Sequence, residues 1–169
     1  MKYTSAEAGK LLKKLENQIN DLVIKENKAA IFNAAAGEDA EALRPKYSFS
    51  ETQKSIAELQ KKVRKVKHAI NVFNTTHELP GHPGVTIDQA LVLIPQLTKQ
   101  ANKLHSMASA LPRERVASYG RSNIIDYVVA NYDIAEAEKC YNEMHDELVS
   151  LQLALDKANT TETMEIDVE

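Results

Sequence analysis

The chain has little of what builds disulfide-bonded, β-rich or membrane-spanning proteins. Its 169 residues include one cysteine, no tryptophan, five glycines and five prolines. A single thiol, Cys140, cannot form an intrachain disulfide, so a disulfide scaffold is excluded and a reducing compartment is expected. The most apolar run, residues 90–95, is too short to span a bilayer. So few turn residues favour long helices over a β-sandwich.

Charge and the start of the chain narrow the function classes further. The 21 basic and 24 acidic residues give a formal net charge of -3. That balance is not a global signature of binding to nucleic acid or to anionic membranes. Residues 1–12 carry the charged Lys2, Glu7 and Lys10 and lack the apolar core of a signal peptide. We therefore expect a cytoplasmic protein with no membrane span.

Heptad spacing is the main signal that is present. Apolar residues recur in alternating steps of three and four, which places them on one face of a helix. This pattern predicts four helices, over about residues 5–35, 51–74, 87–111 and 134–159. Three helix starts have candidate N-caps: Ser50 with Gln53, Thr86, and Asp133 with Glu136. Pro95 lies inside the third segment and predicts a kink or break there.

The connections between these helices differ in character. Residues 33–45 are small and polar and predict a flexible loop, and the Pro and Gly residues at 77–84 predict a turn. The longest connection contains β-branched residues at 124–129, which predict a short strand, and residues 47–49 are its counterpart in the first half. The tail from residue 160 is acidic, and we expect it to be frayed.

The two halves of the chain resemble each other. Residues 69–76 match residues 154–161, and both segments end in Asn–Thr–Thr at the same heptad phase. Tyr47 then aligns with Tyr132, and Thr4 aligns with Thr86 at a slightly different offset. Either this is an internal duplication, with repeats at about 4–76 and 86–161, or heptad patterns match by chance.

The predicted fold class is therefore mainly α. We expect an antiparallel four-helix bundle or coiled coil, built from a duplicated helix–extended segment–helix unit, with a short β element between the third and fourth helices. It forms a single domain over residues 1–163, followed by an acidic tail at 164–169. Residues 90–95 are apolar all round, residues 22–24 add further apolar surface, and Val149 and Leu153 lie off the seam of the fourth helix. This excess of apolar surface predicts a homo-oligomer.

Several of these segments together resemble the septicolysin-like family of small bacterial proteins. They are the Asn–Thr–Thr at 74–76 with the turn after it, and residues 86–90, 119–124 and 158–161. The resemblance covers about residues 8–163 and implies a helical, coiled-coil-like fold. It brings no established active site, and the family name implies cytolysis. The chain departs from the family pattern at Pro95 and at the His–Pro of 82–83.

No catalytic or cofactor-binding constellation stands out from the helical pattern. None of the five histidines follows a glutamate by three residues, as a di-iron bundle requires. His77, Glu78 and His82 lack a convincing fourth metal ligand, so we expect no metal and no cofactor. Cys140 is either a redox-sensitive thiol or an inert, half-buried residue.

Two clusters of basic residues are candidate binding sites. The first lies in the second predicted helix and contains Lys61, Lys62, Arg64 and Lys65. It could follow a phosphate backbone or form the solvated flank of a coiled coil. The second lies in the long connection and contains Arg113, Arg115 and Arg121, with Tyr119 and Ser122. Its guanidinium groups could clamp a small anion or form ion pairs that order the loop.

The leading functional hypothesis is a non-enzymatic, homo-oligomeric helical scaffold or protein-interaction protein. Its basis is that heptads account for most apolar residues and leave no catalytic constellation. The alternatives are nucleic-acid binding through the first basic cluster and small-anion binding or enzyme activity at the arginine-bearing loop.

Overall fold

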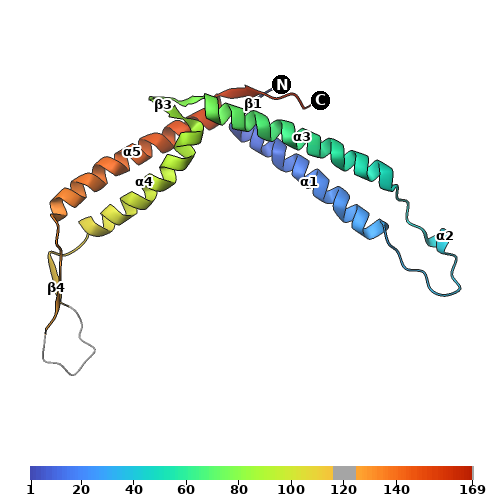
Figure 1. Ribbon diagram of the computed structural model, residues 1–169, viewed down its shortest axis with the longest axis horizontal. Coiled ribbons are helices and arrows are strands. Elements are labelled where there is room, and N and C mark those ends of the chain that lie inside the picture. Colours follow the sequence, from blue (N-terminus) through green and yellow to red (C-terminus); the bar gives the residue numbers. More distant parts are fainter. Residues whose placement is uncertain (116–124, 169) are drawn as a thin grey trace. The chain divides into compact units, whose positions relative to one another are not determined.

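The computed structural model describes residues 1–115 and 125–168 of the chain (Figure 1). The chain is mainly helical with small antiparallel strand pairs, as predicted for its fold class. It divides into two compact units, Met1–Thr76 with Ala158–Glu169 and His77–Lys157. The elements in order are β1 (Lys2–Thr4), α1 (Ser5–Ala29), α2 (Ala40–Leu43), α3 (Phe49–Thr76), β2 (Glu78–Leu79), β3 (His82–Thr86), α4 (Ile87–Ala108), β4 (Arg113–Arg115), β5 (Tyr127–Val129), α5 (Ile134–Thr161) and β6 (Thr163–Glu165).

The first unit is built on an antiparallel hairpin of α1 and α3. Glu16 contacts Lys67 at 3.1 Å, and Glu26 accepts a hydrogen bond from Gln53 at 2.9 Å. Residue numbers therefore rise along α1 as they fall along α3, and Figure 1 shows the two helices side by side. The buried side chains belong to the predicted heptad stripes: Ala8, Leu15, Ile56, Val66 and Phe73.

A short ribbon of β1 and β6 completes this unit. Lys2 pairs with Glu165 and Thr4 with Thr163, and the Ile166 amide donates to the Met1 carbonyl at 2.9 Å. Met164 and Ile166 are buried. The predicted fraying of the tail is wrong, because its apolar residues alternate with acidic ones and a strand buries every second side chain.

The second unit is built on α4 and α5. Figure 1 shows the two helices side by side, and the rings of His105 and Tyr141 meet across them with centroids 5.0 Å apart. α4 is continuous through Pro95, so the predicted break is wrong, and the predicted kink there stays a prediction. The buried side chains again follow the predicted stripes: Ile87, Ala90, Leu97 and Ala101 on α4, and Ala137, Leu148 and Leu151 on α5, together with Ala154 beside the stripe. Ala158, also buried and on the predicted stripe, lies at the end of α5 that belongs to the first unit.

A tight hairpin of β2 and β3 opens the second unit. Leu79 pairs with His82, so Pro80 and Gly81 form the turn between them. Gly81 has φ of +83°, which a residue without a Cβ adopts freely, and proline suits the position before it. The Ile87 amide also donates to the His77 carbonyl at 2.9 Å. The predicted turn over 77–84 is confirmed.

Two of the three predicted caps, Thr86 and Asp133, are confirmed, and Thr4 caps α1 without having been predicted. Thr4 and Thr86 each accept a hydrogen bond from the residue three positions on, and that residue's side chain bonds back to the cap. The reciprocal partners are Glu7 and Gln89, which makes both starts capping boxes. Asp133 accepts from the amides of Ala135 and Glu136 at 2.9 and 3.3 Å.

The region between α1 and α3 departs most from prediction. α1 ends at Ala29 rather than near residue 35, and a short helix, α2, forms inside the predicted flexible loop. Phe49 begins α3, so the strand predicted at 47–49 is wrong. Ser50 is not the cap of α3, because the Ser48 hydroxyl accepts from the Glu51 amide at 3.5 Å. Ser48 and Ser50 are both possible caps in the sequence, and the position at which the helical backbone begins determines which of them is used.

The strand predicted within 124–129 is confirmed as β5. It pairs with β4, which was not predicted, and Arg113 lies opposite Val129. β4 reads Arg–Glu–Arg, which has low strand propensity on its own, so the pairing with β5 determines its conformation.

Candidate interaction surfaces

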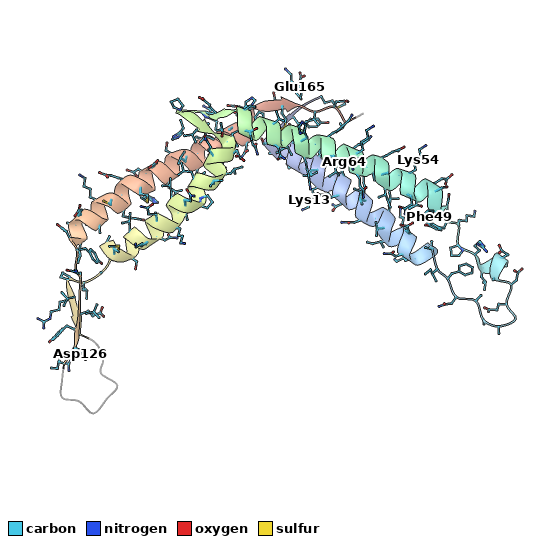
Figure 2. All side chains as sticks on the ribbon, viewed as in Figure 1. Lys13, Phe49, Lys54, Arg64, Asp126 and Glu165 are labelled. Carbon is cyan, nitrogen blue, oxygen red and sulfur yellow. The ribbon has the colours of Figure 1, made fainter. Side chains whose placement is uncertain are left out.

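The predicted basic cluster lies along α3 and is partly neutralised by acidic side chains of the same unit. Lys65 contacts Asp167 of the C-terminal tail at 2.9 Å, and the neighbouring Lys67 contacts Glu16 of α1 at 3.1 Å. Lys61 and Arg64 are exposed and Lys62 is half-buried. Figure 2 labels Arg64 and Lys54 on α3 and Lys13 on α1.

Three members of this cluster keep an uncompensated charge. Among the residues that the structure describes, Lys61, Lys62 and Arg64 form no ion pair. Lys65 thus has an acidic partner and its three neighbours do not, and both interpretations of the cluster, as a phosphate-binding face and as the flank of a coiled coil, stay predictions. The uncompensated charges form the part of α3 that is available to a partner.

A groove of about 420 Å³ runs between α1 and α3. Leu22 and Leu59 contribute apolar surface, and Lys62 lies among its lining residues. The other lining residues are polar or charged: Gln18, Asp21, Lys25, Ser55 and Glu58. Heptad spacing does not predict this groove, because the groove depends on the register between the two antiparallel helices.

A cluster around Glu26 fastens the connection between α1 and α3. The Tyr47 hydroxyl donates to Glu26 Oε1 at 2.5 Å, and the Gln53 amide donates to the same carboxylate. The hydrogen bond to Glu26 raises the pKa of Tyr47 to about 12, because ionising the phenol would break the bond and place a negative charge beside the carboxylate. The sequence showed the polar Glu26 on an otherwise apolar stripe without indicating its partner.

The arginine-bearing loop brings two of its three predicted arginines together. The alternation along a paired ribbon places Arg113 and Arg115 on one face with Tyr127 and Val129. The Arg113 guanidinium lies 3.6 Å from the centroid of the Tyr127 ring, which is a close cation–π contact. Arg121, Tyr119 and Ser122 lie outside the described residues. Tyr127 was missed as a partner, although the period of two from a predicted strand could have placed it.

The opposite face of the same ribbon borders a hollow of about 550 Å³. Glu114 and Val128 lie opposite each other on it, and Leu111 and Tyr132 add further apolar surface. The Tyr132 hydroxyl donates to the Met107 carbonyl at 3.0 Å, close to the end of α4. The ribbon thus presents one basic, aromatic face and an opposite face with one acidic and one apolar residue.

Large apolar side chains are exposed on the long helices of both units. In the first unit Ile24 is 52 % exposed, and in the second Val92 is 58 % and Leu153 is 65 % exposed. Val149 lies one helical turn before Leu153 and is also exposed. Val149 and Leu153 were predicted to lie off the seam of their helix, and Ile24 and Val92 belong to the segments predicted to add further apolar surface.

The remaining candidates for chemistry do not assemble into a site. Within residues 1–115 and 125–168, no group of three or more His, Cys, Asp and Glu residues could hold a metal ion. The His82 ring meets the Ser150 hydroxyl at 3.2 Å, and no acidic group orients that ring within the described part of the chain. Cys140 is exposed rather than half-buried.

Within the part of the chain that the structure describes, no helix combines the length and apolar character needed to cross a membrane.

Comparisons with known proteins define the fold alone. No family model matches the chain, and none of the curated proteins matches it. The chain is similar to the crystal structure of a functionally unknown conserved protein from Corynebacterium diphtheriae. The two share 21 % sequence identity with a TM-score of 0.56, over 98 % of this chain and 100 % of the other.

Proposed function

We propose that the protein is a non-enzymatic, homo-oligomeric helical scaffold or protein-interaction protein. The observation that carries this proposal is the exposure of large apolar side chains on the outer faces of helices in both units, above all at Ile24, Val92 and Leu153. Fully burying such a side chain contributes roughly 1.5–3 kcal/mol, so a few of them at one contact favour association.

The helical hairpins also need more cover than two helices provide. Each helix buries one stripe against its neighbour, and a two-helix arrangement leaves the other faces in water. An antiparallel four-helix bundle is the arrangement that covers such faces most simply, and it is part of the proposal. Assignment to the septicolysin-like family remains a prediction, and cytolysis is not part of the proposal.

Internal duplication is a second part of the proposal, and equivalent local structure supports it. Thr4 and Thr86, which the repeat aligns, both head capping boxes. Tyr47 and Tyr132, also aligned, both donate hydrogen bonds to residues near the end of the preceding long helix. In each unit, a strand that precedes a long helix pairs with a strand that follows one.

Static light scattering coupled to size-exclusion chromatography tests the scaffold. We expect the wild-type chain to elute as an oligomer, and the Val149→Gln, Leu153→Gln variant to shift toward monomer with unchanged helical circular dichroism. Asn142→Gln, an exposed change on the same helix, is the matched control and should leave the oligomer intact. A wild-type chain that is monomeric at every concentration would refute the proposal.

Nucleic-acid binding is the alternative that a specific observation favours, namely the uncompensated Lys61, Lys62 and Arg64 on α3. Phosphate contacts release counterions, so binding through this face must weaken steeply as salt rises. Retention of RNA or DNA that falls with salt, and that is lost in Lys62→Glu, Lys65→Glu, would support it. Indifference of retention to that double variant would exclude this face.

Small-anion binding at the ribbon is a further alternative, favoured by Arg115 beside the Arg113–Tyr127 pair. Thermal-shift measurements with phosphate, nucleotides and carboxylates test it. A stabilisation that disappears in Arg115→Gln would support an anion site, because glutamine keeps a polar side chain but removes the charge.

A further inference from the structure

The long helices that follow the two connections carry opposite charge. α3 has six basic and two acidic side chains, a net charge of +4. α5 has two basic and six acidic side chains, a net charge of −4. Because the repeat aligns these two helices with each other, the difference is between equivalent elements of one chain.

The contrast is sharpest at one pair of aligned positions. Lys61 and Lys62 of α3 align with Asp146 and Glu147 of α5, at the offset that superposes the two Asn–Thr–Thr segments. Asp146 and Glu147 are exposed. Like Lys61 and Lys62, they form no ion pair among the residues that the structure describes.

The chain itself shows how α3 accepts acidic partners. Asp167 reaches Lys65 from the C-terminal tail just after β6, and Glu16 reaches Lys67 from the neighbouring helix. Both contacts lie C-terminal to Lys61, Lys62 and Arg64, so the remaining positive charge is concentrated on one stretch of the helix. An acidic helix packed against that stretch would pair further basic side chains of α3 with carboxylates, as Asp167 already pairs with Lys65.

The acidic face of α5 also carries exposed apolar residues. Val149 and Leu153 follow Asp146 by three and seven residues, which places all three on one face of the helix. A partner that neutralises Asp146 therefore covers Val149 and Leu153 at the same contact. Charge and apolar burial favour the same surface.

We infer that α3 of one copy docks on α5 of a second copy, with Lys61, Lys62 and Arg64 against Asp146 and Glu147. This inference rests on the proposed homo-oligomer and names the contact that builds it. Each chain carries both surfaces, so a two-fold pair makes the contact twice, as an isologous interface requires. A nucleic acid fits less well, since the chain carries net charge -3 and a polyanion would be repelled by α5.

Charge reversal tests the inference directly. Variant one carries Lys61→Glu and Lys62→Glu, and variant two carries Asp146→Lys and Glu147→Lys. Each alone places like charges against each other, so we expect self-association to weaken by about tenfold or more. Lys99→Glu with Lys103→Glu, on the exposed side of α4, matches the charge change of variant one and should leave self-association unchanged.

The decisive measurement mixes the two variants in equal amounts. Variant one then presents negative surfaces and variant two positive ones, so both contacts of a mixed pair become attractive. We expect light scattering to show an oligomer in the mixture that neither variant forms alone. Circular dichroism of each variant establishes that the chains are folded before they are mixed.

The possible outcomes distinguish failure of the inference from failure of the proposed function. A wild-type chain that is monomeric at low and high salt would overturn both. A wild-type oligomer that both reversals leave intact, or a mixture that stays monomeric, would overturn the α3–α5 contact and leave the scaffold standing. Loss of RNA retention in variant one, with self-association unchanged, would assign α3 to nucleic acid instead.

Discussion

The two helical hairpins share their framework and differ in what they present on it. Both start from a threonine capping box, both bury one stripe per helix, and both fasten their connection through a tyrosine hydroxyl. They differ at the connection, where one has α2 and the other the β4–β5 ribbon, and in the charge of the second helix. The two hairpins therefore differ in their connections and in the charge of their outer faces, not in the buried stripes.

The largest expected effect comes from breaking one hairpin core. Leu151 is 2 % exposed on α5 and aligns with the fully buried Val66 of α3. Leu151→Ala should lower the free energy of unfolding by about 2–5 kcal/mol, because it removes buried apolar volume and leaves a cavity.

Hydrogen exchange then shows whether the hairpins are independent. In Leu151→Ala we expect amides of α4 and of residues 134–157 to lose more protection than those of α1. Leu153→Ala, a change of the same size at an exposed position, is the control and should alter stability little. Equal loss of protection in α1 and α4 would show that the two units unfold together.

The capping boxes should make similar contributions in the two hairpins. Thr4→Ala and Thr86→Ala each remove the side chain that satisfies an amide in the first helical turn. Each should lower the free energy of unfolding by about 0.5–2 kcal/mol in denaturant titrations. Thr→Ser at the same positions keeps the hydroxyl and should retain most of the stability. A tenfold disparity between the two alanine variants in the folding equilibrium would contradict equivalent roles.

The hydrogen bond that fastens Tyr47 to Glu26 should be lost only in strong alkali. The pKa of Tyr47 is raised from 10 to about 12, so its contribution to stability is complete below pH 10 and is lost as the pH rises through 12. Subtracting the ultraviolet titration of Tyr47→Phe from that of the wild type isolates this phenol. Tyr132→Phe is the comparison, because its hydroxyl donates to a neutral carbonyl. A Tyr47 transition near pH 10 would show that the bond to Glu26 does not form in solution.

The smallest expected effect is at the tail. Asp167→Asn removes the ion pair with Lys65, whose side chain is 35 % exposed against 78 % for the aspartate. Pairs this exposed are screened by water, so unfolding should change by no more than about 1 kcal/mol. Met164→Asp, at a buried position of β6, should destabilise the unit far more in the same assay. The reverse order would mean that the charge, not the apolar alternation, holds the tail in place.

Much of the helical framework could be predicted because a heptad stripe is a local property of the sequence. Ile56, Val66 and Phe73 were assigned to one stripe by spacing alone, and all three are buried. Thr86 and Asp133 were identified as caps because their side chains act within three residues. The prediction of one helical domain over residues 1–163 stays a prediction.

Features that depend on partners far away in the sequence could not be predicted from local spacing. β6 was missed because the acidic residues of the tail concealed the alternation of Met164 and Ile166, and its partner strand lies at the other end of the chain. Glu26 interrupts an apolar stripe, and only the return of the chain at Tyr47 and Gln53 explains it. At the candidate sites, spacing identified Arg113 and Arg115, but the stacking on Tyr127 required the register of the ribbon.

The β1–β6 ribbon makes the chain suitable for circular permutation. It joins a strand after α5 to a strand before α1, just as the Pro80–Gly81 turn joins β2 to β3. A circular permutant can link residue 168 to residue 1 through a short glycine-rich segment and open the chain between Pro80 and Gly81. In it, β1 and β6 would be joined covalently, and β2 and β3 would be held together by their hydrogen bonds alone. Native-like melting of such a permutant would mean that the order in which the hairpins are synthesised is immaterial to the structure reached.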